Sequence, residues 1–313
     1  MTTRRLLLVA ALGAVAFTGT AAAQDLKEFR IGYQKGGIFS VVKQQRTIEA
    51  RLKTLGVDTV KWIEFQYGPP LMEALGLGAI DIGPVGDTPP IFAQAAGANV
   101  VYVASSPASD SALIVPQSSA IRTLADLKGK KVAFAKGSSS HNLTIQLLAK
   151  AGLTYADITP VYLTPADAAA AFARGSIDAW TIWDPYYAIA ELRQNARTLA
   201  STKDTRPSNS FYLANRAFAG RHPAILQAAI EEVAKVTAWA DKNRDELAAA
   251  ISETTGVELK AQQIAVDRAT IALRPISEAV IAQQQEIADT FHKLGLIPKP
   301  IVVRDAVWRP SGS

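Results

Sequence analysis

The sequence predicts an α/β protein of two lobes, each a mixed, mostly parallel sheet flanked by helices, with a ligand cleft between them. Short apolar strand patterns alternate with helical patterns through the first two thirds of the chain, which is typical of βαβ units. A Ser/Pro/Asp-rich loop at residues 106–111 and a polar stretch at 201–209 interrupt this alternation, as expected where a chain crosses between lobes. The 313 residues, 49% hydrophobic, suffice for about two packed cores.

The first lobe is expected to begin with alternating strands and helices. Apolar, β-branched runs predict the strands, and helical spacing predicts the helices, two of which begin at prolines and two of which end before Gly56 and Gly97. The expected strands are residues 29–34, 60–66, 79–83 and 99–105, and the expected helices are 38–55, 69–75 and 89–96.

The second lobe repeats this rhythm. Its expected strands are residues 112–115, 131–135, 158–163 and 178–182, and its expected helices are 123–127, 139–151, 165–173 and 185–194. After Pro223 the pattern becomes helical, with helices at 223–242, 244–254 and 277–294 that we expect to wrap the first lobe. We therefore expect lobe 1 at 24–106 and 213–313, and lobe 2 at 107–212.

Residues 1–23 have the pattern of a secretory signal peptide. Arg4 and Arg5 precede an apolar run at 6–17, and three alanines end at Ala23. The run is too short for a membrane span, which needs about 20 apolar residues. The chain contains no cysteine for a lipid anchor, so we expect a freely soluble periplasmic protein. The Sec and twin-arginine export routes both remain open.

Composition and motifs exclude several classes of function. The absence of cysteine rules out disulfides, thiolate metal sites and cysteine nucleophiles. The net charge of +5 comes without a dense Lys/Arg run, so no nucleic-acid partner is expected. Three histidines and no Gly-x-Ser-x-Gly, Walker or His-Glu-x-x-His motif argue against a metal or catalytic set. We expect no catalytic residue, metal or cofactor.

A cluster of three serines follows the strand at 131–135 and opens a helix. Ligands of open α/β sheets bind at the carboxyl ends of strands, where helix N-termini present free N–H groups. Ser138, Ser139 and Ser140 would add three hydroxyls, and Gly137 would let the backbone approach a ligand. The alternative is one N-capping serine with two solvated neighbours. His141 next to them fits an exposed position on the helix.

Three further junctions are candidates for the same cleft. Gly86, Asp87 and Thr88 precede a helix, with Asp87 or Thr88 as its N-cap in the alternative interpretation. The amide of Gln34 ends the first strand. Trp183 is either a cleft wall or a core residue. Asp184, before Pro185, is best explained as a helix cap.

Several segments together resemble the aliphatic sulfonate-binding proteins of ABC importers. They are residues 31–36, 86–95, 125–133, 137–142 and 179–187, within a match that runs from about residue 30 to 308. The segment 125–133 is shared by many periplasmic binding proteins and indicates only the fold. The resemblance implies a type II periplasmic binding protein, active as a monomer, that closes around its ligand by a hinge and delivers it to the transmembrane subunits of a permease for sulfur acquisition.

The resemblance also implies a ligand-binding set. It comprises Gln34, Gly86, Asp87, Thr88, Ser138, Ser139, Ser140 and Trp183, to which the adjoining His141 and Asp184 are added.

The chemistry of these donors suits a sulfonate. A sulfonate is a permanent anion with three acceptor oxygens, and hydroxyls with a helix N-terminus can bind it without a formal cation. Because such donors do not titrate, we expect affinity to be nearly constant between about pH 6 and 8. Taurine, nitrate or another small anion remains an alternative ligand. A sulfinate-processing enzyme of similar fold is a further alternative, which the lack of a cysteine nucleophile disfavours.

Overall fold

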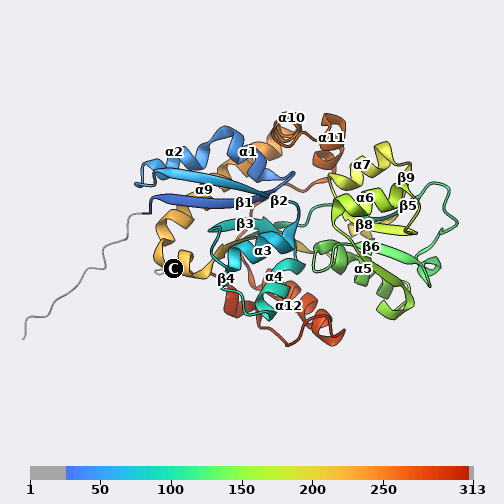
Figure 1. Ribbon diagram of the computed structural model, residues 1–313. Helices are drawn as coiled ribbons and strands as arrows, with labels where there is room; N and C mark the ends of the chain where they lie inside the picture. Colours follow the sequence, from blue (N-terminus) through green and yellow to red (C-terminus); the bar gives the residue numbers. More distant parts are fainter. Residues whose placement is uncertain (1–25, 310–313) are drawn as a thin grey trace, which may run out of the picture.

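The computed structural model describes residues 26–309 and contains two five-stranded sheets, each with helices on both faces (Figure 1). The expected signal peptide, residues 1–23, lies outside the described residues. None of the helices within them combines the length and hydropathy needed to span a bilayer. The expected two-lobed α/β class is confirmed.

The first sheet has the strand order β2-β1-β3-β10-β4. Its strands are β1 (Glu28–Gln34), β2 (Thr59–Phe65), β3 (Ile82–Val85), β4 (Val100–Pro107) and β10 (Asn209–Asn215). β2, β1 and β3 pair in parallel, whereas β10 is antiparallel to both of its neighbours. Four strands therefore point one way and the inserted β10 points the other.

Helices from both ends of the chain cover this sheet. They are α1 (Ile38–Gln45), α2 (Thr47–Lys53), α3 (Gly68–Gly76), α4 (Thr88–Ala95), α8 (Arg216–Arg221), α9 (Pro223–Lys242), α10 (Arg244–Thr255), α11 (Leu259–Arg268) and α12 (Glu278–Lys293). The core on one face includes residues of α1, α2, α9 and α10, and the core on the other includes residues of α3, α4 and α12 (Figure 1). The C-terminal helices thus wrap the first lobe, as expected.

The second sheet has the order β7-β6-β8-β5-β9. Its strands are β5 (Ser111–Pro116), β6 (Lys131–Phe134), β7 (Thr159–Tyr162), β8 (Ala179–Trp183) and β9 (Ala196–Ser201), and its helices are α5 (Ser139–Lys150), α6 (Pro165–Ala173) and α7 (Tyr186–Arg193). α5 covers one face, and α6 and α7 cover the other. Short 3₁₀ turns lie at Leu124–Leu127, Tyr155–Asp157, Thr202–Asp204 and Val303–Ala306.

The chain crosses between the sheets at residues 108–110 and 202–208, and each crossing leads into the antiparallel strand of the sheet that it enters. β10 belongs wholly to the first sheet, although the expected boundary at 212/213 falls inside it. We therefore propose residues 111–201 as lobe 2 and the flanking segments as lobe 1.

Several elements differ from expectation. β9, β10, α8 and α11 were not expected as elements. The helix expected at 38–55 is two helices, because Arg46 adopts a left-handed backbone with φ 54° that ends α1. The strand expected at 79–83 begins at Ile82, because the chain first turns through Gly78 at φ +72°.

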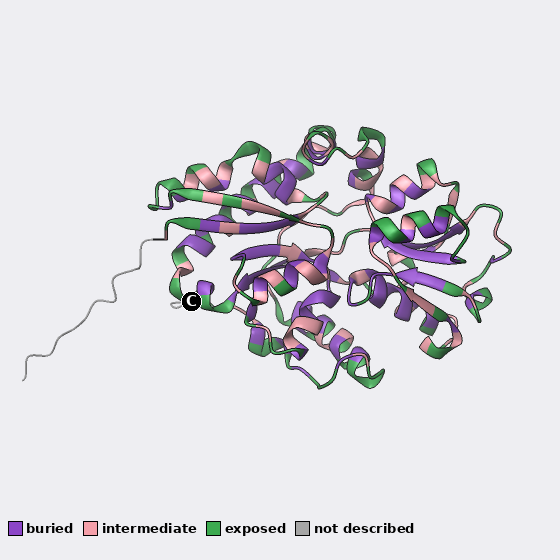
Figure 2. Cartoon of the chain, in the orientation of Figure 1, coloured by how far each residue is buried: buried purple, intermediate pink, exposed green. Residues whose placement is uncertain are grey.

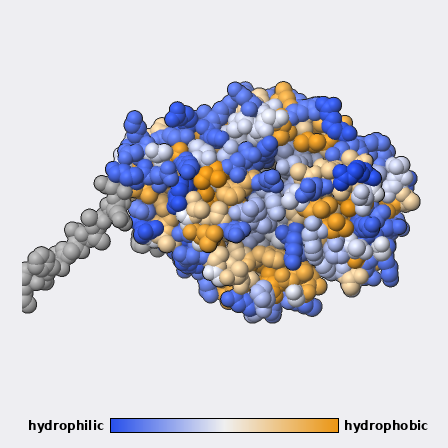
Figure 3. Space-filling view, viewed as in Figure 1, coloured by the Kyte–Doolittle hydropathy of each residue, from blue (hydrophilic) through white to orange (hydrophobic). Residues whose placement is uncertain are grey.

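The inner strands form the buried centre of each lobe, whereas the edge strands β2 and β7 are partly exposed (Figure 2). Trp180 and Ile182 are both almost completely buried in one core of the second lobe, as the alternation along β8 predicts. On the face seen in Figure 3, hydrophobic residues form small separate patches among hydrophilic ones.

Candidate functional site

A cavity of about 240 Å³ lies between the lobes, lined by both. Most of the expected site residues line it, namely Gln34, Gly86, Asp87, Ser138, Ser139, Trp183 and Asp184. Thr88, Ser140 and His141 are buried behind the lining. The strand-to-helix junctions therefore meet at one place, because the carboxyl ends of the parallel strands in both sheets face each other.

The segment Gly137–Ser140, hereafter the serine turn, joins β6 to α5. Its hydroxyls do not cap the helix: the Ser138 Oγ donates to the Ala135 carbonyl at 2.7 Å and lies 2.8 Å from the Ser140 Oγ. The Ser139 hydroxyl lines the cavity and forms no hydrogen bond with the described residues. The N–H groups of Ser139 and Ser140 are at the helix start, where no intrahelical acceptor exists. The serine turn thus presents unpaired donors to the cavity.

Asp87 links the two lobes instead of capping α4. Its Oδ1 accepts from the Thr88 hydroxyl and its Oδ2 from the Asn142 side-chain amide, both at 2.7 Å. Asn142 belongs to α5 of the opposite lobe, so this hydrogen bond crosses the cleft. Burial raises the pKa of Asp87 to about 6, although the Thr88 and Asn142 hydrogen bonds oppose the shift. The carboxylate is satisfied by the protein itself.

Gly86 permits the lobes to approach closely. A Cβ atom at this position would lie 2.9 Å from both the Cβ and the Oγ of Ser139. Real Cβ contacts are almost never this short. A glycine here therefore allows the serine turn of the second lobe to contact the end of β3 in the first.

Gln34 and Trp183 reach the cavity from different lobes. The Gln34 Nε2 donates to the Pro84 carbonyl at 2.8 Å, which fixes the amide at the ends of β1 and β3. Trp183 ends β8, is partly exposed, and packs edge-to-face on Tyr186 with ring centroids 6.3 Å apart. Of the two interpretations of Trp183, the cavity wall matches its position.

Asp184 lies one residue before Pro185, which is the N-cap of α7, so the expected N-cap is shifted by one residue; the Asp184 Oδ1 still accepts from the Ala188 N–H of the first turn at 3.0 Å. The same oxygen lies 3.5 Å from the Arg268 guanidinium of α11. Its Oδ2 is buried and accepts no hydrogen bond from the described residues. Burial raises the pKa of Asp184 to about 6, with Arg268 opposing the shift. With Asp87, the cavity therefore has two carboxyls that titrate near pH 6, which sequence reasoning did not anticipate.

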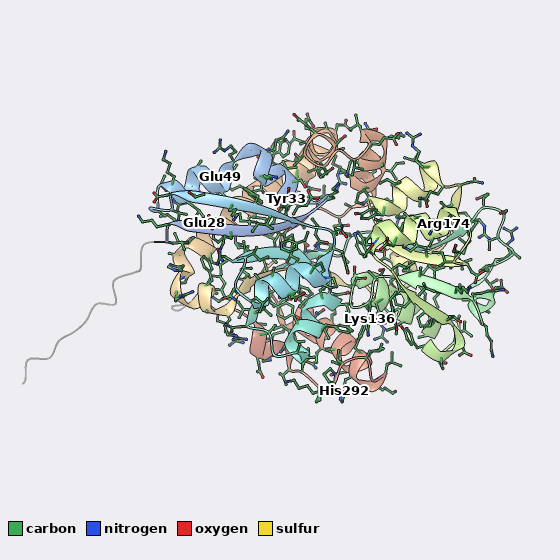
Figure 4. The ribbon with its side chains drawn as sticks, viewed as in Figure 1. Glu28, Tyr33, Glu49, Lys136, Arg174 and His292 are labelled. Atoms are coloured by element: carbon green, nitrogen blue, oxygen red, sulfur yellow. The ribbon has the colours of Figure 1, made fainter. Side chains whose placement is uncertain are left out.

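His141 is fully buried, so its expected position on the helix surface is wrong. Its ring stacks on Phe134 with centroids 4.9 Å apart, its Nδ1 accepts from the Gly137 N–H at 3.3 Å, and its Nε2 lies 3.1 Å from the Tyr155 hydroxyl. Burial, with a smaller effect of Lys136, lowers the pKa of His141 to about 4. Lys136, the second cause of this shift, lies where the second lobe meets α4 (Figure 4). The neutral imidazole supports the serine turn from behind.

Several lining residues were missed. Asn142 follows the serine turn directly and could have been found from it. The segments 106–111 and 202–212 line the cavity because the crossings border it. Residues 269–272 join them from the end of α11, and no local signal marks them. Among the described residues, no group of three or more His, Cys, Asp or Glu could hold a metal ion.

Comparison with known proteins gives consistent matches. A family model described as NMT1/THI5 like matches residues 63–247. An aliphatic sulfonates-binding protein of Escherichia coli is 42% identical over 97% of this chain and 96% of its own length. An aliphatic sulfonates-binding protein of Bacillus subtilis is 33% identical over 91% of this chain and 86% of its own length.

Solved structures agree in fold. The alkanesulfonate-binding protein SsuA from Xanthomonas axonopodis, bound to MOPS, is 40% identical, with a TM-score of 0.86 over 91% of this chain and 99% of that protein. The desulfurization enzyme DszB, at 13% identity and a TM-score of 0.63, shares the fold alone.

Proposed function

Because the chain belongs to the NMT1/THI5-like family and, within it, to the aliphatic sulfonate-binding proteins, we propose that it binds an aliphatic sulfonate in the cavity between its lobes. It then delivers this ligand to the transmembrane subunits of an ABC importer. Its work is binding and release, and we propose that it acts as a soluble monomer in the periplasm.

The serine turn is the observation that carries this proposal. Two hydroxyl-bearing residues, Ser138 and Ser139, and the free N–H groups at the start of α5 converge on the cavity. Helix N-termini carry about half a positive charge and bind anions through backbone donors. Among the described lining residues Lys35 is the one Lys or Arg, so most of the anion's stabilisation must come from neutral donors. A monovalent anion with three oxygens suits this arrangement.

The Asp87 carboxylate favours a sulfonate over phosphate at the serine turn. Hydrogen phosphate carries a proton that needs an acceptor, and a carboxylate aimed at the anion would supply it. Asp87, the carboxylate linked to the serine turn through Asn142, has both oxygens occupied by protein donors. A sulfonate has no proton to donate and needs no such acceptor.

Closure follows from contacts that cross the cleft. The Asp87–Asn142 hydrogen bond and the close approach of Gly86 to Ser139 join the two lobes, and we expect both to be lost when the lobes separate. A sulfonate that contacts both lobes stabilises this closed form by its differential affinity for it. The cavity is smaller than the usual range for drug-sized ligands, so a short organic tail fits best.

Isothermal titration calorimetry on the mature protein tests the proposal. The protein is unfolded, washed and refolded to remove any co-purified ligand, and is kept in Tris chloride because sulfonate buffers would compete. Methane-, ethane- and butanesulfonate, taurine, nitrate, sulfate and phosphate are then titrated. We expect sulfonates to bind at least about tenfold more tightly than the inorganic anions. Tightest binding of nitrate or phosphate would contradict the proposal, and product formed from a sulfonate or sulfinate would support the enzyme alternative.

A further inference from the structure

Helix α11 joins the two lobes at a second place, besides the Asp87–Asn142 hydrogen bond. Val266 of α11 belongs to the same core as Leu247 and Ile251 of α10, which anchors the helix in the first lobe. α11 also lies beside α7, a helix of the second lobe (Figure 1). Contacts between α11 and α7 therefore join parts of the molecule that we expect to move apart when the cleft opens.

Arg268, the last residue of α11, contacts the second lobe through its guanidinium. Its Nη2 donates to the Oε2 of Glu191, and its Nη1 lies 3.5 Å from the Oδ1 of Asp184. The guanidinium also lies over the ring of Tyr187, 4.0 Å from its centroid. The charged side chains are largely buried, with Asp184 6% and Arg268 22% exposed. The two carboxylates thus share one cation that comes from the opposite lobe.

The segment that follows Arg268 is a wall of the ligand cavity. Residues 269–272 line the cavity, although Arg268 is not among the described residues that do so. A little further on, Arg274 and Ser105 of β4 exchange backbone hydrogen bonds of 2.7 and 2.8 Å, which attach the segment to the first lobe. Arg268 attaches its other end to the second lobe. The position of this wall therefore depends on both attachments.

We propose that Arg268 is a positioning residue that stabilises the closed form through Asp184 and Glu191, and so slows the release of the ligand without contacting it. The inference rests on the proposed function and concerns how the same site retains its ligand. In the open form the three charged groups would each be solvated. In the closed form, loss of the guanidinium would leave two carboxylates buried without their cation, which is strongly unfavourable. Apparent affinity then falls with the population of the closed form.

Arg268→Met tests the proposal, because it removes the charge and keeps an unbranched side chain. Stopped-flow tryptophan fluorescence follows binding of butanesulfonate, since Trp183 lines the cavity. We expect dissociation to become at least about tenfold faster, a difference of ~1.4 kcal/mol, while association stays within about threefold because the contact forms after the ligand has entered. The affinity ratios among methane-, ethane- and butanesulfonate should not change. A merely structural role would lower the unfolding free energy of the ligand-free protein and leave the dissociation rate unchanged.

Arg193→Met is the matched control. Arg193 of α7 pairs with Glu258 of α11 at 2.8 Å and so joins the same two helices, but the two side chains are 65% and 41% exposed. Exposed ion pairs contribute little, so both rates should stay within about twofold of wild type.

Glu191→Gln tests the same contact from the other lobe. It should speed dissociation about threefold, because Asp184 still faces the guanidinium. The double variant Arg268→Met/Glu191→Gln should release the ligand no faster than Arg268→Met alone, since the contact is already lost.

Each remaining outcome also decides the question. A dissociation rate within about threefold of wild type in Arg268→Met, additive effects in the double variant, or equal acceleration in Arg193→Met overturns the inference. A changed ratio of ligand affinities also overturns it, because Arg268 would then contact the ligand. If Arg268→Met does not fold, an unchanged dissociation rate in Glu191→Gln overturns it. Absence of sulfonate binding by the wild type overturns the proposed function instead.

Discussion

Replacing Ser139 by alanine should weaken sulfonate binding without destabilising the protein. The Ser139 hydroxyl lines the cavity and has no hydrogen-bond partner among the described residues, so its removal breaks no internal bond. A hydrogen bond to a charged ligand contributes roughly 1.5–3 kcal/mol, which corresponds to an affinity loss of about 10- to 150-fold. The free energy of unfolding should change by no more than about 0.5 kcal/mol, because Ser139 is only half-buried and its hydroxyl has no partner to lose.

Ser140 provides the matched control. It has the same side chain one residue further on, but it is fully buried and its Oγ lies 2.8 Å from that of Ser138. Ser140→Ala should therefore lower the free energy of unfolding by about 1 kcal/mol and leave affinity within about threefold. Calorimetry with butanesulfonate and urea denaturation measure the two quantities on each variant. Replacing Ser138, Ser139 and Ser140 together should weaken binding by about a hundredfold or more.

The affinities of the two single variants together test whether the Ser139 hydroxyl contacts the anion. If Ser139→Ala binds within about threefold of wild type, a change of ~0.65 kcal/mol, the hydroxyl does not contact the anion. If Ser140→Ala loses more affinity than Ser139→Ala, the serine turn acts by its shape, and the donor set inferred here is wrong.

Three further substitutions probe closure and acid stability. Gly86→Ala should weaken the binding of every ligand, because the new Cβ would lie 2.9 Å from Ser139 in the closed form. Small-angle scattering should show that the liganded variant is more open than the wild type. A scattering curve identical to that of the liganded wild type would refute this. Asn142→Ala leaves Asp87 Oδ2 without its donor from the other lobe. Ligand affinity measured by calorimetry should therefore fall about tenfold or more. An unchanged affinity would mean that the hydrogen bond is also present in the open form. His141 has a pKa lowered to about 4, so the unfolded chain binds more protons between pH 4 and 6.5 and stability falls as pH drops through that window. Between pH 7 and 5, the free energy of unfolding measured by urea denaturation should fall by about 2 kcal/mol less in His141→Phe than in the wild type. If the free energy of unfolding falls equally with pH in the two proteins, the acid sensitivity comes from other groups.

The local sequence pattern predicted most elements but not those that depend on distant partners. α9 runs over Pro223–Lys242 as expected, because a proline start and apolar spacing define it. β10 begins with Asn209 and Ser210 and is identifiable only from its pairing with β3 and β4. α11 buries only Ala261, Gln262 and Val266, and it is held by its contacts with α10 and α7. No Gly or Pro marks the break between α1 and α2 at Arg46.

The candidate site could likewise be predicted only where a local sequence pattern marks it. Strand-to-helix junctions can be read from sequence, so Gln34, Gly86 and Trp183 were found. The burial of His141 could not be predicted, because Phe291, which packs edge-on against its ring, comes from α12 near the other end of the chain.

The expected constancy of affinity also needs revision. Burial raises the pKa values of Asp87 and Asp184 to about 6, and neither shift is visible before the lobes are assembled. A constant affinity is therefore expected only above about pH 7, where both carboxyls stay ionised.

The insertion of β10 between β3 and β4 determines the order in which the chain can fold. β4 has no strand partner within its own sheet until residues 209–215 have been synthesised, whereas every strand of the second sheet lies within residues 111–201. The later lobe can therefore complete its sheet before the earlier one. Pairing across so long a separation is slow, since contacts distant in sequence form late. In an export route that threads unfolded chains, this delay keeps the first lobe incomplete until about two thirds of the polypeptide has been made.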